Sequence, residues 1–216
     1  MVTFNMLYLP VLSVTGERLM PCHAARARQL VRKGKAIKRH DRGIAYLVLT
    51  ERKTGVTQPV ALGVDPGNKR EAYTIQSERH TFLNIQSEAI DWVKKAMETR
   101  SMMRRSRRLR KTPYRPKRIN RSRGNIPVST KARWNWKVRI AQWVARYYPI
   151  TKIVVEDIAA PTKQGKRRWN AGFSPLQVGK EYCYAELGKL AEVQVIPSHY
   201  TKPLREQAGL TKSKNK

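Results

Sequence analysis

The sequence predicts an α/β fold, with a mixed-sheet core that is interrupted by an arginine-rich helix and preceded by a small N-terminal α/β domain. Two apolar runs rich in β-branched residues, VALGVD (60–65) and ITKIVVED (150–157), are typical of buried strands. Three strand-like runs follow one another closely within residues 60–87, which indicates antiparallel pairing. A long stretch with helical periodicity then separates the two apolar runs.

Residues 1–55 are predicted to form the small N-terminal domain. Its expected strands are YLPVLSV (8–14) and IAYLVLTE (44–51), and CHAARARQLVRKGKA (22–36) between them has a helical periodicity that Gly34 closes. The exposed face of this helix is basic and consists of Arg26, Arg28, Arg32 and Lys33. Such a face fits a nucleic-acid contact, and an ordinary solvated helix surface is the alternative.

The core is predicted in two parts around the arginine-rich helix. Residues 56–87 form the first part, in which VALGVD, EAYTIQS and HTFLNIQ make an antiparallel meander. Residues 88–124 start as an amphipathic helix and continue as a basic tract, which is broken at Pro113. Residues 125–216 hold a helix, the second apolar strand, another helix and a last strand.

The first helix of that second part carries an apolar stripe, which we expect to be buried core rather than a base-stacking platform. The stripe consists of Trp136, Ile140, Trp143 and Val144. The complete order of elements is β-β-β, long helix, β, helix, β. This order resembles an RNase H-like core.

The charge of the chain points to a polyanionic partner. Lys and Arg number 45 against 15 Asp and Glu, so the formal net charge of the 216 residues is +30. Nucleic acid is the polyanion that best explains an excess of this size. No apolar run approaches the roughly 20 residues that cross a bilayer, and the opening residues do not resemble a signal peptide. We therefore expect a cytoplasmic protein without a membrane partner.

The cysteines and histidines do not predict a zinc site or a disulfide framework. Cys22 and Cys183 lie far apart and have no Cys-x-x-Cys partner, and the four histidines lack metal-ligand spacing. Both cysteines are expected to be small buried hydrophobic residues.

An acidic residue ends each of the two apolar strands. Asp65 follows VALGV and Glu156 follows KIVV. If the two strands are parallel neighbours, both carboxylates emerge at one sheet edge, where they would suit Mg²⁺ ions in a two-metal phosphodiesterase site. Strand alternation turns Asp157 to the opposite face, which makes it the poorer second ligand. The alternative is that both acids are structural and pair with some of the many arginines.

Four features in this order resemble the IsrB and IscB families of transposon-encoded RNA-guided nucleases. ALGVDPGNK (61–69) looks like the first RuvC nuclease motif, KIVVED (152–157) looks like the second, and the arginine-rich helix between them resembles a bridge helix. GERLMPCHAARARQLVRKGKA (16–36) resembles the N-terminal segment called PLMP or RRXRR. FSPLQVGKEYCYAELGKL (173–190) and TKPLREQAGLTKSKNK (201–216) look more like IsrB, which lacks the HNH nuclease insert.

The resemblance implies an RNA-guided nickase of the non-target DNA strand, with a RuvC-like core and Mg²⁺ as its cofactor. Asp65 and Glu156 would be its catalytic, metal-binding residues. A guide RNA (omega RNA), or its heteroduplex with target DNA, would contact basic residues of the N-terminal helix, the bridge helix and the following tract. These are Arg26, Arg28, Arg32, Arg104, Arg105, Arg107, Arg108, Arg110, Arg115, Lys117 and Arg118. Such contacts read shape and charge, while base pairing supplies the sequence specificity. We expect a monomeric protein within a ribonucleoprotein.

The sequence departs from the family pattern in one respect. The third RuvC motif, an acidic residue on a helix after the last core strand, and the segment that reads the DNA motif flanking the target are not found in the 216 residues. A truncated chain, a natural form that binds without cutting, and a missing half supplied elsewhere are the three explanations. Two alternative functions therefore stay open: a cleavage-incompetent guide-RNA-binding protein, and a basic RNA-binding protein of ribosomal type.

Overall fold

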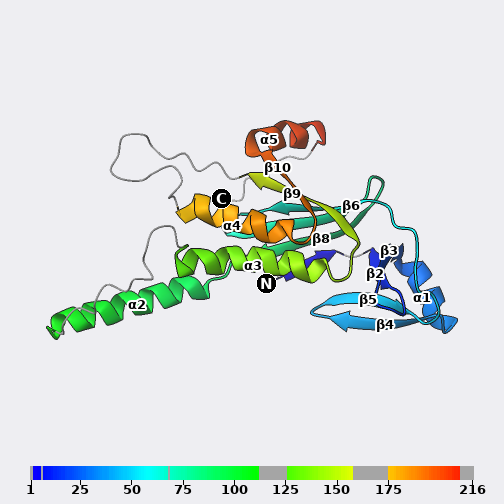
Figure 1. Cartoon of the computed structure of the whole chain (residues 1–216), viewed down its shortest axis with the longest axis horizontal. Helices are drawn as coiled ribbons and strands as arrows, with labels where there is room; N and C mark the ends of the chain where they lie inside the picture. The colour runs from blue at the N-terminus through cyan, green and yellow to red at the C-terminus, as the bar shows by residue number, and fades with distance from the viewer. Residues whose placement is uncertain (1, 6, 68, 112–125, 158–174, 210–216) are drawn as a thin grey trace.

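The structure is a computed structural model that describes residues 2–5, 7–67, 69–111, 126–157 and 175–209. Within these ranges the fold is mixed α/β, with two mixed sheets and five helices (Figure 1). The strands are β1 (Val2–Asn5), β2 (Tyr8–Leu12), β3 (Arg18–His23), β4 (Ala36–Asp41), β5 (Ile44–Leu49), β6 (Val60–Asp65), β7 (Arg70–Gln76), β8 (Thr81–Glu88), β9 (Ile150–Asp157) and β10 (Glu192–Pro197). The helices are α1 (Ala24–Arg32), α2 (Trp92–Leu109), α3 (Val128–Val144), α4 (Pro175–Gly188) and α5 (Ser198–Gln207).

The larger sheet has the strand order β1-β8-β7-β6-β9-β10. The expected meander is confirmed, because β6 pairs antiparallel with β7 and β7 pairs antiparallel with β8. On its other side β6 is parallel to β9, and β9 is parallel to β10. Without the edge strand β1, the strands lie across the sheet in the order β8-β7-β6-β9-β10. Numbered along the chain, these five strands therefore have the order 3-2-1-4-5.

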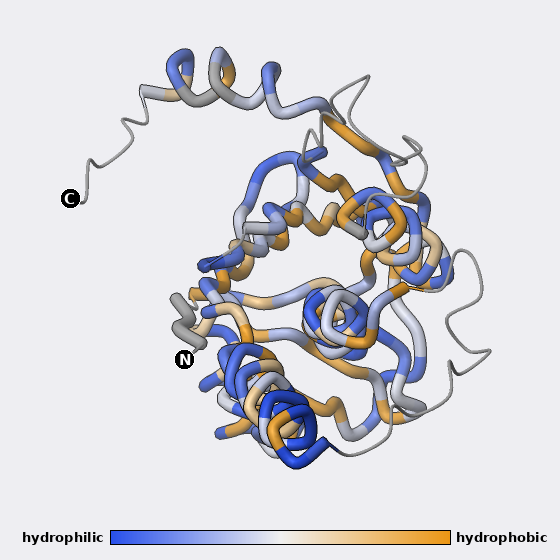
Figure 2. The backbone as a smooth tube through the Cα atoms, turned by 90° about the vertical axis from the view of Figure 1, so that its left-hand side faces the viewer, coloured by the Kyte–Doolittle hydropathy of each residue, from blue (hydrophilic) through white to orange (hydrophobic). Residues whose placement is uncertain are grey.

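The helices α3 and α4 pack on one face of this sheet and close its core (Figure 1). Val60, Leu62 and Val64 alternate along β6 and are 5% exposed or less, because residues two apart in a strand point to the same face. The apolar stripe of α3 is confirmed as core: Val144 is fully buried, and Trp136 packs at its margin. In Figure 2 the hydrophobic residues accordingly run through the central strands and the helices beside them.

The smaller sheet has the order β3-β2-β5-β4 and carries α1. The expected strands at 8–14 and 44–51 and the helix between them are confirmed. The helix begins after His23, whose Nδ1 lies 3.2 Å from the Ala25 amide, and it is closed by Gly34 at φ 68°. The division predicted at residue 55 stays a prediction, and β1 pairs with β8 in the larger sheet.

The two sheets meet at the C-terminal end of α3. Asp41 at the end of β4 accepts hydrogen bonds from Trp143 Nε1 at 3.1 Å and from the Tyr147 hydroxyl at 2.6 Å. The rings of Tyr46 and Tyr147 lie 4.7 Å apart, and Ile44 is fully buried in the larger core. These contacts fix the smaller sheet against the larger one.

None of the described helices combines the length and the apolar character that crossing a bilayer requires.

Candidate functional site

The two acidic strand ends lie at the same edge of the larger sheet. Val64 of β6 pairs with Val155 of β9 in parallel register, and Asp65 and Glu156 are the next residue on each strand. Because side chains alternate, both carboxylates face away from the buried Val64 and Val155, and therefore away from α3 and α4. Asp65 is exposed and Glu156 is half-buried. The condition for a shared edge, parallel pairing of these two strands, is met.

The helix α5 brings a hydroxyl group to this edge. It follows β10 directly and packs on β9 and β10. The Thr201 hydroxyl lies 2.6 Å from Glu156 Oε1 and 2.8 Å from the Ser198 carbonyl oxygen. A hydrogen bond from Thr201 orients the Glu156 carboxylate and leaves its second oxygen for another partner. Sequence reasoning missed α5, since Pro203 lies inside it and its residues are largely polar.

Asp157 points to the other face of the sheet, as strand alternation predicted. Its Oδ1 lies 2.5 Å from Lys180 Nζ and 3.1 Å from the Tyr184 hydroxyl, both on α4. Lys180 is 7% exposed, so this ion pair belongs to the helix-covered side. Burial and the neighbouring Asp157 raise the pKa of Tyr184, which stays a neutral hydrogen-bond donor. Asp157 is therefore held by α4 on the helix-covered face of the sheet.

A buried ion pair lies beneath the turn that follows Asp65. Lys137 of α3 donates to Glu71 of β7, and their side chains are 8% and 1% exposed. The Tyr73 hydroxyl donates to the other oxygen of Glu71 at 2.7 Å, and Lys137 Nζ lies 3.4 Å from the Gly67 carbonyl oxygen. Lys137 thus connects α3 to the backbone two residues after Asp65. The position of Lys137, about one helical turn before Ile140 on the apolar stripe, could have indicated from the sequence that this lysine is buried. The sequence did not indicate that Glu71 is its partner.

Gly67 itself is required by the tightness of that turn. A Cβ atom at this position would lie 1.7 Å from the carbonyl oxygen of Arg70, far inside van der Waals contact. The Gly67 amide also donates to the Asp65 carbonyl oxygen at 3.0 Å. The turn therefore determines where β6 ends and where its terminal carboxylate emerges.

The carboxylates of Asp65 and Glu156 fit a hard divalent cation such as Mg²⁺. Two oxygen donors on adjacent strands, one of them exposed, match the few carboxylates plus water that Mg²⁺ accepts. In the part of the chain that the structure describes, no group of three or more His, Cys, Asp or Glu residues is placed to hold a metal. These two residues would therefore provide part of a coordination shell, with water or phosphate oxygens completing it.

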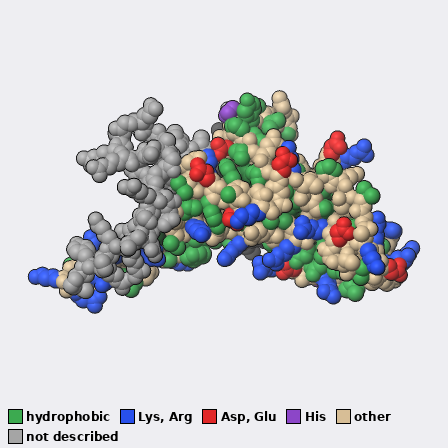
Figure 3. All heavy atoms as spheres, viewed as in Figure 1, with side chains coloured by type: hydrophobic (Ala, Val, Ile, Leu, Met, Phe, Trp, Pro, Cys, Tyr) green, Lys and Arg blue, Asp and Glu red, His purple; other side chains and the backbone are tan. Residues whose placement is uncertain are grey.

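The predicted RNA-contacting residues that the structure describes lie on α1 and on α2 with its C-cap residue Arg110. Arg26, Arg28 and Arg32 are all exposed on α1. The helix α2 projects from the body of the molecule, and along its 18 residues only Val93 is buried (Figure 1). Figure 3 shows Lys and Arg side chains at its far end.

The arginines of α2 form a basic surface on a protruding rod of roughly 27 Å, from a rise of 1.5 Å per residue. Arg100, Arg104 and Arg107 share one face, since residues four and three apart lie above one another. The other arginines of this segment are exposed: Arg105, Arg108 and Arg110. Arg115, Lys117 and Arg118 lie outside the described residues.

The fold and these surfaces define a basic α/β protein with a carboxylate pair at one sheet edge. The chain belongs to the RRXRR protein family, whose family model matches residues 9–172. This match covers α1, both acidic strand ends and α2. No curated protein matches the chain.

Proposed function

We propose that this protein is an IsrB-like RNA-guided DNA-binding protein with an RNase H-like, RuvC-type core. The observation that carries the proposal is the placement of Asp65 and Glu156 on the first and fourth core strands, at one edge and on one face of the sheet. A core with strand order 3-2-1-4-5 and an antiparallel second strand supports the same assignment. The site would nick the displaced, non-target DNA strand.

Different residues of the chain would hold the metal ion, orient its ligands and position the turn at this edge. A bound Mg²⁺ supplies Lewis acidity, which lowers the pKa of bound water and stabilises charge on phosphate oxygens. Asp65 and Glu156 would hold the ion, and Thr201 keeps Glu156 in one orientation. Lys137 would act as a positioning residue, because it holds the turn after Asp65 from below. The face around Asp65 is built from small residues such as Gly63 and Ala72, which leaves room for a DNA backbone.

The basic helices would bind the nucleic acid itself. An exposed arginine surface on a protruding helix contacts phosphates without reading bases, so guide pairing would supply the sequence specificity. The partners would be a guide RNA and its target DNA.

A guide-RNA-binding protein without cleavage activity is the second candidate. The observation that favours it is the absence, among the residues the structure describes, of a third metal-binding side chain near Asp65 and Glu156. Both candidates share the basic surface and differ only in what happens at the sheet edge.

One experiment tests both candidates. RNA that copurifies with the protein from its native cells is sequenced, and the complex is incubated with supercoiled plasmid carrying the matching target and Mg²⁺. Nicking that is lost in Asp65→Asn and Glu156→Gln supports the nickase. Retained RNA and target binding without nicking supports the second candidate, and no copurifying RNA contradicts both.

A further inference from the structure

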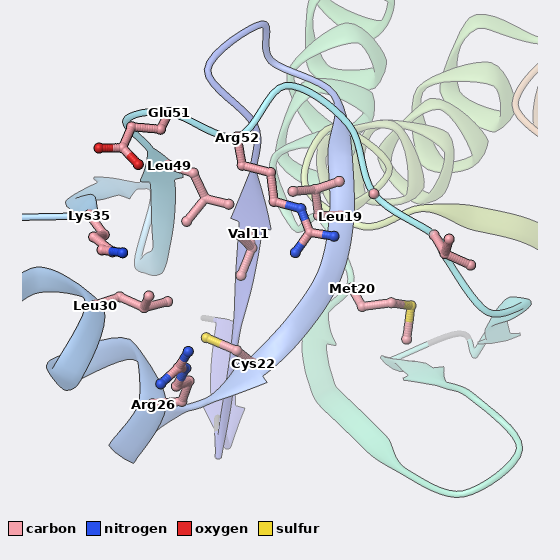
Figure 4. A pocket seen from close by; sticks show the side chains of 12 residues that line it. Val11, Leu19, Met20, Cys22, Arg26, Leu30, Lys35, Leu49, Glu51 and Arg52 are labelled. Atoms are coloured by element: carbon pink, nitrogen blue, oxygen red, sulfur yellow. The ribbon is translucent and has the colours of Figure 1, made fainter.

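The N-terminal sheet carries a cavity of about 310 Å³ that the carboxylate site does not use. It lies between α1, the small sheet and the segment 51–56 (Figure 4). Its floor is aliphatic and is formed by Val11, Leu19, Leu30 and Leu49. Volumes of this size are at the lower limit of small-molecule sites, which suits a single flat group.

The rim of the cavity is cationic. Arg26, Lys35 and Arg52 line it with Glu51 as the single acid, and all four are exposed. An aliphatic floor with such a rim complements a ligand that joins an apolar planar group to phosphates. A peptide of uncharged residues would supply the apolar part but not the negative charge on either side of it.

Arg52 is held in place across the opening. Its Nε donates to the Thr54 carbonyl oxygen at 2.9 Å, and a Cβ at Gly55 would lie 3.1 Å from its Nη2. The guanidinium therefore rests against the backbone of Gly55. Figure 4 shows its side chain beside Leu19. A planar guanidinium fixed in this way offers a stacking face to a nucleobase.

We propose that this cavity binds one unpaired nucleobase of the bound RNA, with the flanking phosphates on Arg26 and Lys35. The inference rests on the proposed function as far as RNA binding, and it is independent of cleavage. The floor presents aliphatic carbon, so the base is held by stacking and apolar contact and not by hydrogen bonds to its edge. The cavity would thus select unpaired positions of an RNA over a continuous duplex.

Cys22 lines the cavity and provides a built-in reporter. The chain has two cysteines, and Cys183 is 2% exposed, with burial raising its pKa to about 12. Burial also raises the pKa of the Cys22 thiol, so its alkylation by iodoacetamide is followed at one fixed alkaline pH and only rate ratios are compared. Peptide mass spectrometry reads the two cysteines separately.

The decisive comparison uses two oligonucleotides of equal length and charge, an unstructured oligo(A) RNA and an abasic oligomer. At ten times its Kd, oligo(A) should slow Cys22 alkylation about tenfold, because about one tenth of the protein is then free. The abasic oligomer, which binds through phosphates alone, should leave the rate close to that of the free protein. Equal protection by both, or protection by neither while RNA binds, overturns the proposal and leaves the proposed function standing. Failure of both oligomers to bind contradicts the proposed function as well.

A pair of variants on α1 provides an independent test. Leu30→Trp fills the cavity, whereas Val31→Trp places the same side chain on the exposed face, where Val31 is 41% exposed. Losing one stacked base should weaken oligo(A) binding by about 5- to 150-fold in Leu30→Trp, which corresponds to 1–3 kcal/mol per base. Val31→Trp should bind as the wild type does. Equal affinity of the two variants for oligo(A) contradicts the proposal. If Leu30→Trp does not fold, the alkylation comparison on the wild-type chain decides alone.

Discussion

The substitution Lys137→Met tests the buried ion pair under the candidate site. It removes the cation from Glu71, which is 1% exposed and keeps only the Tyr73 hydrogen bond among those described above. The methionine fills a similar volume, so the effect reports the lost charge and not a cavity. Gly67 loses the contact with Lys137 at the same time.

The expected loss in the free energy of unfolding follows from the Glu71 charge, which stays buried in the variant. Removing one partner of a buried ion pair costs about 3–5 kcal/mol, because the other charge stays in the core without compensation. A domain of ordinary stability has about 5–15 kcal/mol in total, so the loss is a large fraction of it. With a urea m-value of about 2 kcal/mol/M, the unfolding midpoint should fall by roughly 2 M.

Urea denaturation followed by circular dichroism measures this shift. Lys131→Met on the same helix is the matched control, since Lys131 is exposed and lies 5.3 Å from the Tyr182 ring centroid. An exposed cation–π contact is worth about 0.5–1 kcal/mol, so the control should shift the midpoint far less. The double variant Glu71→Gln/Lys137→Met, which leaves no buried charge at this pair, should recover part of the loss. A midpoint for Lys137→Met equal to that of Lys131→Met would refute the reasoning.

Three further predictions concern the metal, the nucleic acid and the junction of the sheets. Asp65→Asn should weaken Mg²⁺ binding in isothermal titration while leaving the urea midpoint nearly unchanged, because Asp65 is exposed; unchanged Mg²⁺ affinity would contradict its role as a ligand. Replacing four arginines of α2 by glutamine should lower RNA affinity and flatten the plot of log K against log salt by up to about 3–4 units, at roughly 0.7–0.9 per phosphate contact. An unaltered slope would exclude α2 from the interface. The four are Arg104, Arg105, Arg107 and Arg108. The hydrogen bond from Tyr147, with a smaller contribution from Trp143, lowers the pKa of Asp41 in the folded protein. The Asp41 carboxylate therefore stabilises the fold fully above its unfolded pKa of about 3.9, and this stabilisation is lost as the pH falls through its folded pKa. Asp41→Asn should therefore reduce the fall in urea midpoint between pH 7 and pH 3, and a fall as large as in the wild type would contradict this.

The sequence was sufficient for the elements whose burial follows a simple period. The strand β6 alternates between buried and less buried residues, and the buried side of α3 follows helical spacing, so both were predictable from hydrophobicity. The shared acidic ends of β6 and β9 suggested a common edge only on the condition that the two strands are parallel neighbours, and the structure supplies that pairing.

The elements that sequence reasoning missed lack this period. The strand β4 has one buried residue, Ala36, and its other side chains are exposed or half-buried, so its pattern resembles a polar loop. The strand β3 contains Pro21 and only one buried residue. β1 pairs with a strand about 80 residues later in the chain, and local sequence carries no signal for such a partner.

The acidic residues on the two faces of the larger sheet have different kinds of partner. On the face covered by helices, Glu71 and Asp157 each pair with a lysine, Lys137 from α3 and Lys180 from α4. Glu71 is 1% exposed, and a buried carboxylate without a cation would be too costly. Strand alternation places Asp65 and Glu156 on the opposite face, where α5 supplies a hydroxyl group to Glu156. A hydroxyl orients a carboxylate without neutralising it, so the Thr201 contact adds no positive charge beside Glu156. The two lysines therefore neutralise acids of the helix-covered face, whereas the Thr201 hydroxyl on the other face leaves the Glu156 carboxylate suited to a divalent cation.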